Sequence, residues 1–149
     1  MDVTIRQFID RDADALVEIL KRNNQYEYPN TEGPDAMRKV AECDAALFLI
    51  VVINSTVVGC IRAIYDGSRA MIHLLSVHPE FQNRGIGTNL VNSVVQVLND
   101  RGALTISVTV TDSSRVFWDK LGFNKLPVYL MIRDINIKAI TRETTASKQ

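Results

Sequence analysis

The first third of the chain switches from alternating apolar positions to helical spacing, which predicts a strand followed by helices. Residues 3–7 alternate as a short strand. Asp12 follows as the expected cap of a helix, and a turn-rich stretch at 23–34 separates that helix from a second short one over roughly 35–43. The apolar face of the first helix consists of Ala15, Leu16, Ile19 and Leu20.

Three consecutive apolar runs occupy the middle of the chain. The runs at 46–53, 56–65 and 69–77 have the length and β-branched content of strands. Turn formers separate them at 54–55 and at 66–67, where Asp-Gly is a favoured hairpin pair. Strands joined by such short turns lie side by side, so the sequence predicts an antiparallel meander.

The remainder alternates between helix and strand. We expect a helix over 85–99, a strand over 104–110, a shorter helix from about 113 to 121 and a final strand over 127–135. The apolar face of the 85–99 helix consists of Leu90, Val91, Val94, Val95 and Leu98. Together with the preceding strand, this helix and the strand at 104–110 form a βαβ unit, whose two strands should be parallel. The predicted class is α+β, with a mixed, mostly antiparallel twisted sheet that contains one parallel βαβ unit and is flanked by helices.

Length and composition favour one domain with a continuous core. The chain has 149 residues, of which 46% are hydrophobic, and its formal net charge is zero. We expect residues 1–137 to form the domain and the polar, aperiodic residues 138–149 to form a frayed tail. With balanced and scattered charges, neither nucleic acid nor a membrane surface is an expected partner.

Cysteine spacing and the terminal sequence limit the function further. Cys43 and Cys60 match neither a metal site nor a redox pair, so both are expected to be reduced core residues, with no metal bound. The first ten residues lack the apolar core of a signal peptide, and the apolar run at 45–53 is too short to cross a bilayer. These features favour a cytoplasmic protein.

The stretch FQNRGIGTNL at 81–90 places a glycine turn between a strand and a helix. Backbone N–H groups and the positive end of the helix dipole converge at such a turn, which suits a phosphate group. The stretch is neither a Walker loop nor a dinucleotide fingerprint, because no GK[ST] follows and Leu90 stands where a third glycine is needed. Taken alone, it is either an ordinary helix N-terminus or an anion site.

Two motifs resemble the GNAT superfamily of N-acetyltransferases. VHPEFQNRGIGTNLV is similar to its acetyl-coenzyme A signature, in which Gln82, Gly85 and Gly87 fill the defining positions. SSRVFWDKLGF, at 113–123, resembles the family's short helix and its Phe-Tyr and Gly-Phe ending. The element order over roughly 3–135 also agrees. The resemblance implies a three-layer αβα fold and an enzyme that transfers an acetyl group from acetyl-coenzyme A to an amine by direct attack, without a covalent enzyme intermediate.

The resemblance also implies a coenzyme site. Backbone amides of the glycine turn would hold the pyrophosphate, and pantetheine would lie between the strand at 69–77 and the strand at 104–110. An amide near Val77 would point at the thioester carbonyl, and Thr111 stands where many members have an asparagine. The coenzyme-binding residues expected from this comparison are Leu75, Val77, Gln82, Asn83, Arg84, Gly85, Ile86, Gly87, Thr88, Thr111 and Phe117.

Catalysis by this route requires a base, because an alkylamine with a pKa near ~10 reaches the enzyme as an ammonium ion. Many members of the family use a glutamate early in the strand at 69–77, but this chain has Met71 there. His73 lies two residues further along, so strand alternation directs it to the same face. His73 is therefore the candidate base, and a hydrogen-bonded strand histidine without a catalytic task is the alternative.

The leaving thiolate has several candidate proton donors in this sequence. The family's Phe-Tyr pair is Phe117 and Trp118 here, and an indole N–H is not an acid near neutral pH. The thiolate would leave unprotonated or take a proton from Ser76, water or the substrate. Trp118 is alternatively a core residue of an amphipathic helix, and a slow or inactive protein is a further alternative.

The acceptor is expected opposite the coenzyme, between the first helices and the strand at 56–65. Tyr26, Tyr28 and Glu32 are the candidate substrate-binding residues, with Arg62 nearby, unless the stretch is simply a solvated loop. The leading prediction is acetylation of a primary amine of a small molecule. Acetylation of a protein N-terminus and a catalytically degenerate coenzyme-binding module are the alternatives. Self-association through the final strands, common in the family, makes a homodimer a further expectation.

Overall fold

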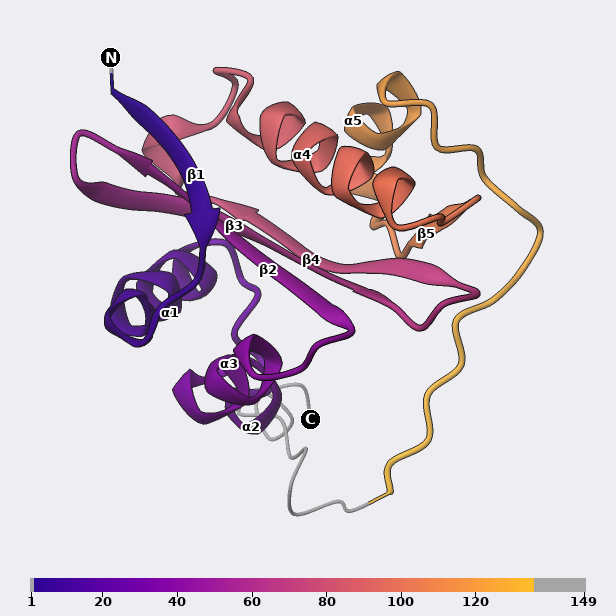
Figure 1. Ribbon diagram of the computed structural model, residues 1–149, viewed down its shortest axis with the longest axis horizontal. Coiled ribbons are helices and arrows are strands. Elements are labelled where there is room, and N and C mark those ends of the chain that lie inside the picture. Colours follow the sequence, from indigo (N-terminus) through magenta and orange to yellow (C-terminus); the bar gives the residue numbers. More distant parts are fainter. Residues whose placement is uncertain (1, 136–149) are drawn as a thin grey trace.

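The computed structural model describes residues 2–135, which form a five-stranded sheet with helices on both faces (Figure 1). The strand order is β1-β2-β3-β4-β5, and all neighbours are antiparallel except β4 and β5. The strands are β1 (Val3–Gln7), β2 (Ala46–Ile53), β3 (Thr56–Tyr65), β4 (Ala70–Val77) and β5 (Ile106–Val108). The mixed α+β class and the single parallel βαβ unit are therefore confirmed.

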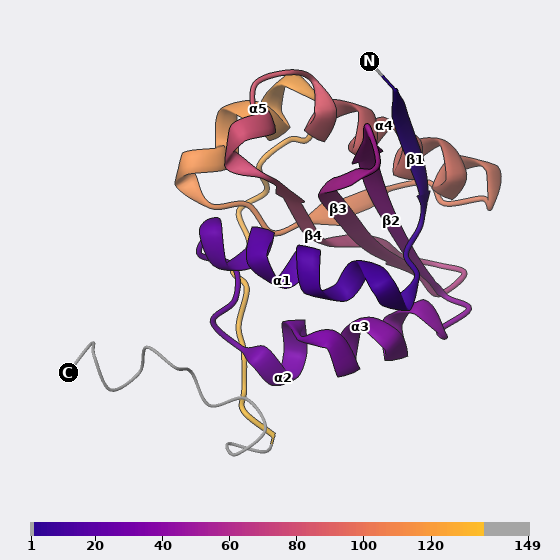
Figure 2. The same ribbon diagram turned by 90° about the vertical axis from the view of Figure 1, so that its left-hand side faces the viewer.

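The helices divide between the two faces of the sheet, as Figures 1 and 2 show from two directions. One layer contains α1 (Ala13–Arg22), α2 (Pro29–Glu32) and α3 (Pro34–Ala41), and the other contains α4 (Ile86–Asp100) and α5 (Arg115–Lys120). Three short 3-10 turns complete the described elements: η1 (Asp10–Asp12), η2 (Pro79–Phe81) and η3 (Asp112–Ser114). This is the expected three-layer αβα arrangement.

Residues of β2 explain how one sheet supports two cores. Leu47, Val51 and Ile53 belong to the cluster under α4, whereas Phe48 and Ile50 belong to the cluster under α1 and α3. Successive side chains of a strand point to opposite faces. The almost continuous apolar run of β2 therefore places apolar side chains on both faces of the sheet. β2 is consequently buried on both faces along most of its length.

Several sequence expectations fail in detail. Asp12 precedes α1 but its side chain makes no capping hydrogen bond, because it binds Arg6 and the Ile9 amide instead. Ala15 is exposed, and so is Cys43, while Cys60 is buried. On α4, Val95 is 36% exposed, so it lies at the edge of the apolar face.

The C-terminal part differs most from expectation. β5 has three residues, although a strand of seven was predicted at 104–110. No strand forms over 127–135, and the side chains from Val128 to Ile132 are 64–92% exposed. A strand needs a hydrogen-bonding neighbour, and among residues 2–135 none pairs with this segment. The predicted tail at 138–149 lies outside the described residues.

Candidate active site

The glycine turn places free backbone donors at the start of α4. Asn83 and Gly85 have φ values of 62° and 82°, and the first intrahelical hydrogen bond runs from the Asn89 amide to the Gly85 carbonyl at 3.0 Å. The amides from Gly85 to Thr88 precede that bond and therefore lack helical acceptors. No side chain caps this end, and its first turn contains no acidic residue. The turn consequently offers several N–H groups and a helix dipole to an anion.

The two positions of the turn favour glycine for different structural reasons. Gly85 requires the left-handed conformation, and a Cβ there would meet no atom within 4 Å. A Cβ at Gly87 would lie 3.4 Å from the ring of Phe117 and 3.8 Å from Cδ2 of Leu75. The structure thus brings together three of the predicted coenzyme residues, from β4, α4 and α5.

β5 pairs along its whole length, but only with the beginning of β4. Ala70, Met71 and Ile72 pair with Ile106, Ser107 and Val108, whereas β4 continues to Val77 with no β5 residue opposite it. The β5-facing backbone groups of the later part of β4 therefore have no strand partner on this side within residues 2–135. Leu75 and Val77 lie in this unpaired part, as a strand-like ligand between the two strands requires.

Side-chain amides bind the carbonyls of this unpaired part, and sequence analysis missed two of the three. Gln25 Nε2 donates to the Leu75 carbonyl at 3.0 Å, and Asn23 Nδ2 donates to the Val77 carbonyl at 2.8 Å. Gln82 Nε2 also donates to the Val77 carbonyl, at 2.9 Å. The signature glutamine thus fixes the end of β4. Asn23 and Gln25 lie in a turn-rich stretch, where no local pattern separates such residues from ordinary loop amides.

Ser76 is buried beside these amides. Its side chain is 3% exposed, and its Oγ accepts a hydrogen bond from Asn23 Nδ2 at 2.8 Å. Ser76 pairs with Cys60 of β3, whose cluster lies under α1 and α3. The hydroxyl therefore belongs to the face of the sheet opposite α4.

His73 lies at an irregularity of β4. Arg62 pairs with Leu74 and Ala63 pairs with Ile72, so His73 is an extra residue between two matched pairs. Such a bulge changes the direction of a side chain relative to a regular strand. Partial burial lowers the pKa of His73, and the positive charge of Arg62 lowers it further. The imidazole is thereby kept neutral to a lower pH than an ordinary histidine.

Arg62 forms an ion pair on the face of the sheet that α1 and α3 cover. Arg62 Nη1 donates to Glu32 Oε2 at 3.1 Å, and the two side chains are only 12% and 22% exposed. Burial raises the pKa of Glu32, against the opposing effect of Arg62. Arg62 Nε is buried and has no hydrogen-bond partner among the described residues. This is the one buried side-chain polar atom of residues 2–135 that lacks a hydrogen-bond partner. The Arg62–Glu32 pair therefore has one donor left for a further hydrogen bond.

The two predicted tyrosines lie in the loop just before α2. Tyr26 packs against the cluster under α1 and α3, and its hydroxyl lies 3.0 Å from where a Cβ at Gly33 would be. Tyr28 is half-buried directly before α2. Both tyrosines therefore lie in the layer that holds Glu32, on the side of the sheet away from α4.

The downstream motif divides into an exposed and a buried part. The Thr111 hydroxyl is shared with Ser113 and Ser114 Oγ atoms at 3.2 and 3.1 Å, on an exposed turn. Trp118 is 5% exposed and makes edge-on contacts with Phe117 and Phe123, with ring centroids 5.1 and 5.2 Å apart. Trp118 is thus a core residue, as one of the sequence alternatives proposed.

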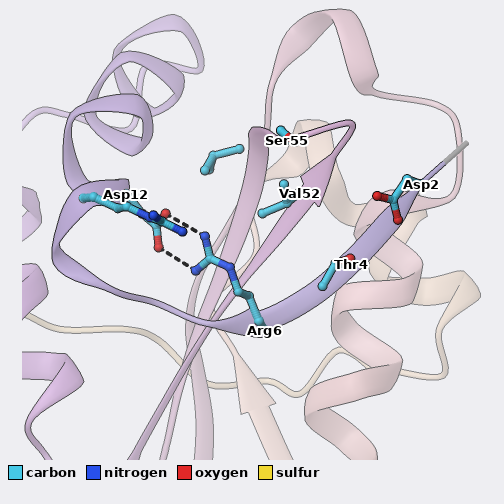
Figure 3. Close-up of a pocket in the computed structure, with 8 residues that line it drawn as sticks. Asp2, Thr4, Arg6, Asp12, Val52 and Ser55 are labelled. Carbon is cyan, nitrogen blue, oxygen red and sulfur yellow. Dashed lines mark hydrogen bonds and ion pairs between the residues drawn. The ribbon is translucent and has the colours of Figure 1, made fainter.

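Two surface hollows lie away from these residues, and the first is at the β1 edge of the sheet. It has a volume of about 520 Å³ and lies at β1, the opposite edge of the sheet from β5, around the Arg6–Asp12 ion pair (Figure 3). A second hollow, of about 650 Å³, lies between β1 and α4. Neither contains a predicted site residue. The candidate site is therefore identified by its chemistry and not by a hollow of large volume.

Comparisons with known proteins agree with this arrangement. A family model described as the acetyltransferase (GNAT) family matches residues 13–123. The structure is similar to PaiA N-acetyltransferase from Thermoplasma acidophilum in complex with coenzyme A, at 19% identity and a TM-score of 0.78, over 87% of this chain and 94% of that one. It is also similar to Ard1 from Thermoplasma volcanium, at 22% identity and a TM-score of 0.72, over 83% and 84% of the two chains.

A third similar structure is the aminoglycoside N-acetyltransferase AAC(6')-Iy in complex with CoA. The identity is 16% and the TM-score 0.70, over 91% of this chain and 96% of that one. At these identities the structural likeness shows a shared fold. No described helix is long and apolar enough to cross a membrane. The family model covers most of the chain, including both motifs, and the chain therefore belongs to the GNAT family of acetyl-coenzyme A-dependent N-acetyltransferases.

Proposed function

We propose that the protein transfers an acetyl group from acetyl-coenzyme A to a primary amine of a small molecule by direct attack. The observation that carries this proposal is the start of α4, where a glycine turn presents amides that have neither helical acceptors nor a capping side chain. The same turn lies beside the part of β4 that β5 leaves unpaired. A helix N-terminus beside an open strand suits a ligand with a pyrophosphate and an extended amide-bearing arm.

The residues present fit acetyl-coenzyme A, which supplies the acetyl group as a thioester when bound. The amides from Gly85 to Thr88 would hold the pyrophosphate, and the absence of a carboxylate in the first turn avoids repulsion. Arg84, stacked over Phe81 with its guanidinium 5.2 Å from the ring centroid, adds a positive charge beside the turn. Leu75 and Val77 would bind the pantetheine arm through their backbone N–H groups, because side-chain amides already occupy both carbonyls.

The end of β4 is rigid enough to orient a carbonyl group. Two side-chain amides hold the Val77 carbonyl, which fixes the peptide plane on one side of that residue. The Val77 N–H, on the unpaired part of the strand, would donate to the thioester carbonyl oxygen. A fixed donor aimed at developing negative charge stabilises the transition state without reorganisation.

His73 would take the proton from the incoming ammonium ion. Its lowered pKa keeps the ring neutral at pH 7, which is the protonation state that a base requires. Ser76 was the other predicted catalytic residue, but its hydroxyl is buried and already binds Asn23. Because a thiol has a pKa of about 8.5, the thiolate can leave without being protonated. We therefore assign Ser76 a structural role, in which its hydroxyl accepts the Asn23 hydrogen bond and holds that side chain in place.

The face under α1, α2 and α3 would receive the acceptor. Arg62 and Glu32 offer both signs of charge there, and Tyr26 and Tyr28 offer apolar surface with hydroxyl groups. Because Arg62 already pairs with one carboxylate oxygen of Glu32, this face suits an acceptor that carries polar groups besides its amine. A compact polar amine fits these features better than a peptide, which needs a groove with backbone partners.

Calorimetric titration of the purified, ligand-free protein with acetyl-coenzyme A tests the coenzyme site. Saturable binding near one equivalent is expected for the wild type, and Gly87→Glu should weaken it at least about 100-fold, because a carboxylate would face the phosphates. Asn92→Glu is the matched control, since it adds the same charge on an exposed turn of the same helix and should leave binding unchanged. Equal binding by wild type and Gly87→Glu would contradict the site.

A panel of amines and a panel of peptides separate the acceptor classes. Turnover of small amines with inert peptides supports the proposal, whereas the reverse result would make the protein an N-terminal acetyltransferase. Tight coenzyme binding without turnover on either panel would identify a catalytically degenerate binding module.

A further inference from the structure

β1 forms the edge of the sheet opposite β5, and its outer side has no strand partner within residues 2–135. Its pairing with β2 fixes which backbone groups point outward. The Asn54 amide donates to the Asp2 carbonyl, so the even-numbered residues of β1 bond to β2. The N–H and C=O groups of Val3, Ile5 and Gln7 therefore point away from the sheet. Such a row of free groups is a template for another strand.

The sequence of this edge is complementary to itself when a second copy is placed antiparallel. Residues 2–6 read DVTIR. When the second β1 lies with its Thr4 opposite Thr4, each Val3 lies opposite an Ile5. Each Asp2 then lies opposite an Arg6, so the two outer pairs carry opposite charges. In this register the outward Ile5 amide of each strand donates to the outward Val3 carbonyl of the other.

The charged side of the edge has donors left for such a pair. Asp2, Thr4 and Arg6 lie along one face of β1, beside the hollow of about 520 Å³ (Figure 3). Arg6 already donates from Nη1 to Gln7 and from both Nη atoms to Asp12. Its Nε and the second hydrogen of Nη2 have no hydrogen-bond partner among the described residues. Arg6 is therefore able to bind a second carboxylate without releasing Asp12.

The other side of the edge is apolar and uncharged. A hollow of about 650 Å³ lies there between β1 and α4, lined by Val3, Ile5 and Val97 and by uncharged polar side chains of α4. α4 has no charged residue before Asp100, although one side of this helix is exposed. Exposed helix faces normally carry charged side chains, whereas the centre of a protein interface is depleted of them. This surface is therefore suited to burial against another protein.

We propose that this edge binds a second copy of the chain, with the two β1 strands antiparallel about a two-fold axis at Thr4, so that the two sheets become continuous. A two-fold contact requires a surface that is complementary to itself, and the order of residues 2–6 provides one. The contact lies at the opposite edge from β5 and does not involve the segment at 127–135. Because β1 is short, we expect half-association near about 100 µM.

Disulfide trapping tests the position of the axis. Thr4→Cys in a Cys43→Ser background leaves only the buried Cys60 besides the new thiol. Residues opposite each other at this position have Cα atoms about 4.5 Å apart, within the span of a disulfide, so oxidation should convert most chains to covalent dimers. Val3→Cys is the matched control and should not cross-link alone, because each Val3 lies opposite an Ile5.

Two further outcomes of the trapping decide the register. Val3→Cys chains mixed with Ile5→Cys chains should form mixed disulfides, because these positions are opposite each other. No covalent dimer of Thr4→Cys, or equal yields from Thr4→Cys and Val3→Cys alone, would overturn the proposal. These measurements require neither coenzyme nor acceptor, so their result does not depend on the proposed enzymatic function.

Light scattering over a concentration series measures the association without a cross-link. The wild-type mass should approach twice the 16.7 kDa chain mass at about 500 µM. Asp2→Arg should halve that mass, because it places arginine opposite Arg6, and Ile5→Pro should do the same, because it removes an outward N–H without breaking a bond to β2. Both variants should keep the wild-type circular dichroism spectrum.

Asp44→Arg is the matched control for the charge change. It makes the same substitution at an exposed residue in the turn before β2, away from the β1 edge, and should keep the wild-type mass. A wild type that is monomeric at about 500 µM would overturn the proposal, since even a small specific interface associates at that concentration. A folded Asp2→Arg or Ile5→Pro variant that keeps the wild-type mass would overturn it as well.

Discussion

The two faces of the central sheet carry different kinds of side chain. Under α4 and α5, the core consists entirely of apolar side chains, from Leu47 on β2 to Trp118 on α5. Under α1 and α3, the apolar cluster is smaller, and this side also holds the Arg62–Glu32 ion pair and the buried Ser76, while His73 lies close enough to Arg62 for its charge to lower the histidine pKa. Both faces share the same strands, so the difference comes from alternate residues of β3 and β4.

The comparison shows where stability and chemistry are separated. An apolar face tolerates no unpaired polar group and contributes the burial that holds the sheet together. A face with partly buried charges is less stable than an apolar one of the same size, because desolvating each charge costs free energy. Such a cost is expected where side chains serve a ligand, so variants on the two faces should differ in what they damage.

The largest effect is expected from the apolar face. Leu90 of α4 is fully buried, and Leu90→Ala should lower the free energy of unfolding by about 3 kcal/mol, because it removes apolar contacts and leaves a cavity. Chemical denaturation measures this loss. Val95→Ala, on the same helix at a 36% exposed position, is the control and should cost less than about 1 kcal/mol. Similar losses in both variants would contradict the assignment of the core.

The other face should respond in rate before it responds in stability. His73→Ala should lower kcat/KM about 100-fold near pH 7, the size of effect typical of a lost general base. Because burial and Arg62 lower the pKa of His73, the wild-type rate should fall only below about pH 6.5, as the ring becomes protonated. The deficit of the variant should shrink toward pH 10, where the amine loses its proton unaided.

His73→Gln separates a base from a structural residue. Glutamine keeps a hydrogen-bonding side chain of similar length but takes no proton. If His73 only supports β4, then His73→Gln should restore the rate and coenzyme affinity together. A pH profile equal to that of the wild type in both variants would remove His73 from the mechanism.

These contrasts also explain which features the sequence could predict. β2, β3 and β4 begin and end within one residue of expectation, because short turns at Asn54 and Gly67 bound them and their apolar runs are long. The glycine turn was predictable for the same reason, since a left-handed residue at Gly85 must come directly before the helix. In such places local chemistry alone decides the structure.

Features that depend on distant partners were not predictable. Arg62 and Glu32 are thirty positions apart, and only the family resemblance placed them near each other, because no local pattern links them. Asn23 was missed because it acts on Val77, which only the fold brings near. The segment at 127–135 has a clear strand pattern, yet a strand exists only where an edge receives it. The sequence pattern shows that this segment is able to form a strand, but it forms one only where a neighbouring strand pairs with it.

A smaller effect is expected at the edge of the sheet, where Asp12 lies against Arg6. The two side chains make two hydrogen bonds, at 2.9 and 3.0 Å, and the Asp12 side chain is 2% exposed. Asp12→Asn should lower the free energy of unfolding by about 2 kcal/mol near pH 7, because the partly exposed Arg6 loses its counter-charge. Asp10→Asn is the control, because the Asp10 side chain is largely exposed and its variant should change stability by less than about 0.5 kcal/mol.

The pH dependence of this effect has a fixed sign. Burial alone would raise the pKa of Asp12, but hydrogen bonds from Arg6 and the Ile9 amide outweigh it and hold the pKa below its ordinary value. A carboxyl with a lowered pKa contributes stability above its unfolded pKa of about 4 and loses it as the pH falls through the folded value. The difference between wild type and Asp12→Asn should therefore shrink below about pH 4, and a constant difference would contradict the ion pair.

The smallest effect is expected at Cys60, which lies on the face that holds the Arg62–Glu32 ion pair and yet should be inert. Burial raises the pKa of its thiol to about 12, so at pH 7 roughly one molecule in 10⁵ carries a thiolate. Cys43 is exposed, so a thiol reagent should label one cysteine in the native protein and two after unfolding. Cys43→Ser should abolish labelling of the native protein. Labelling Cys43 in the wild type should not change the acetylation rate. Rapid native labelling of Cys60 would show that this face opens to solvent, which would weaken the contrast between the two faces.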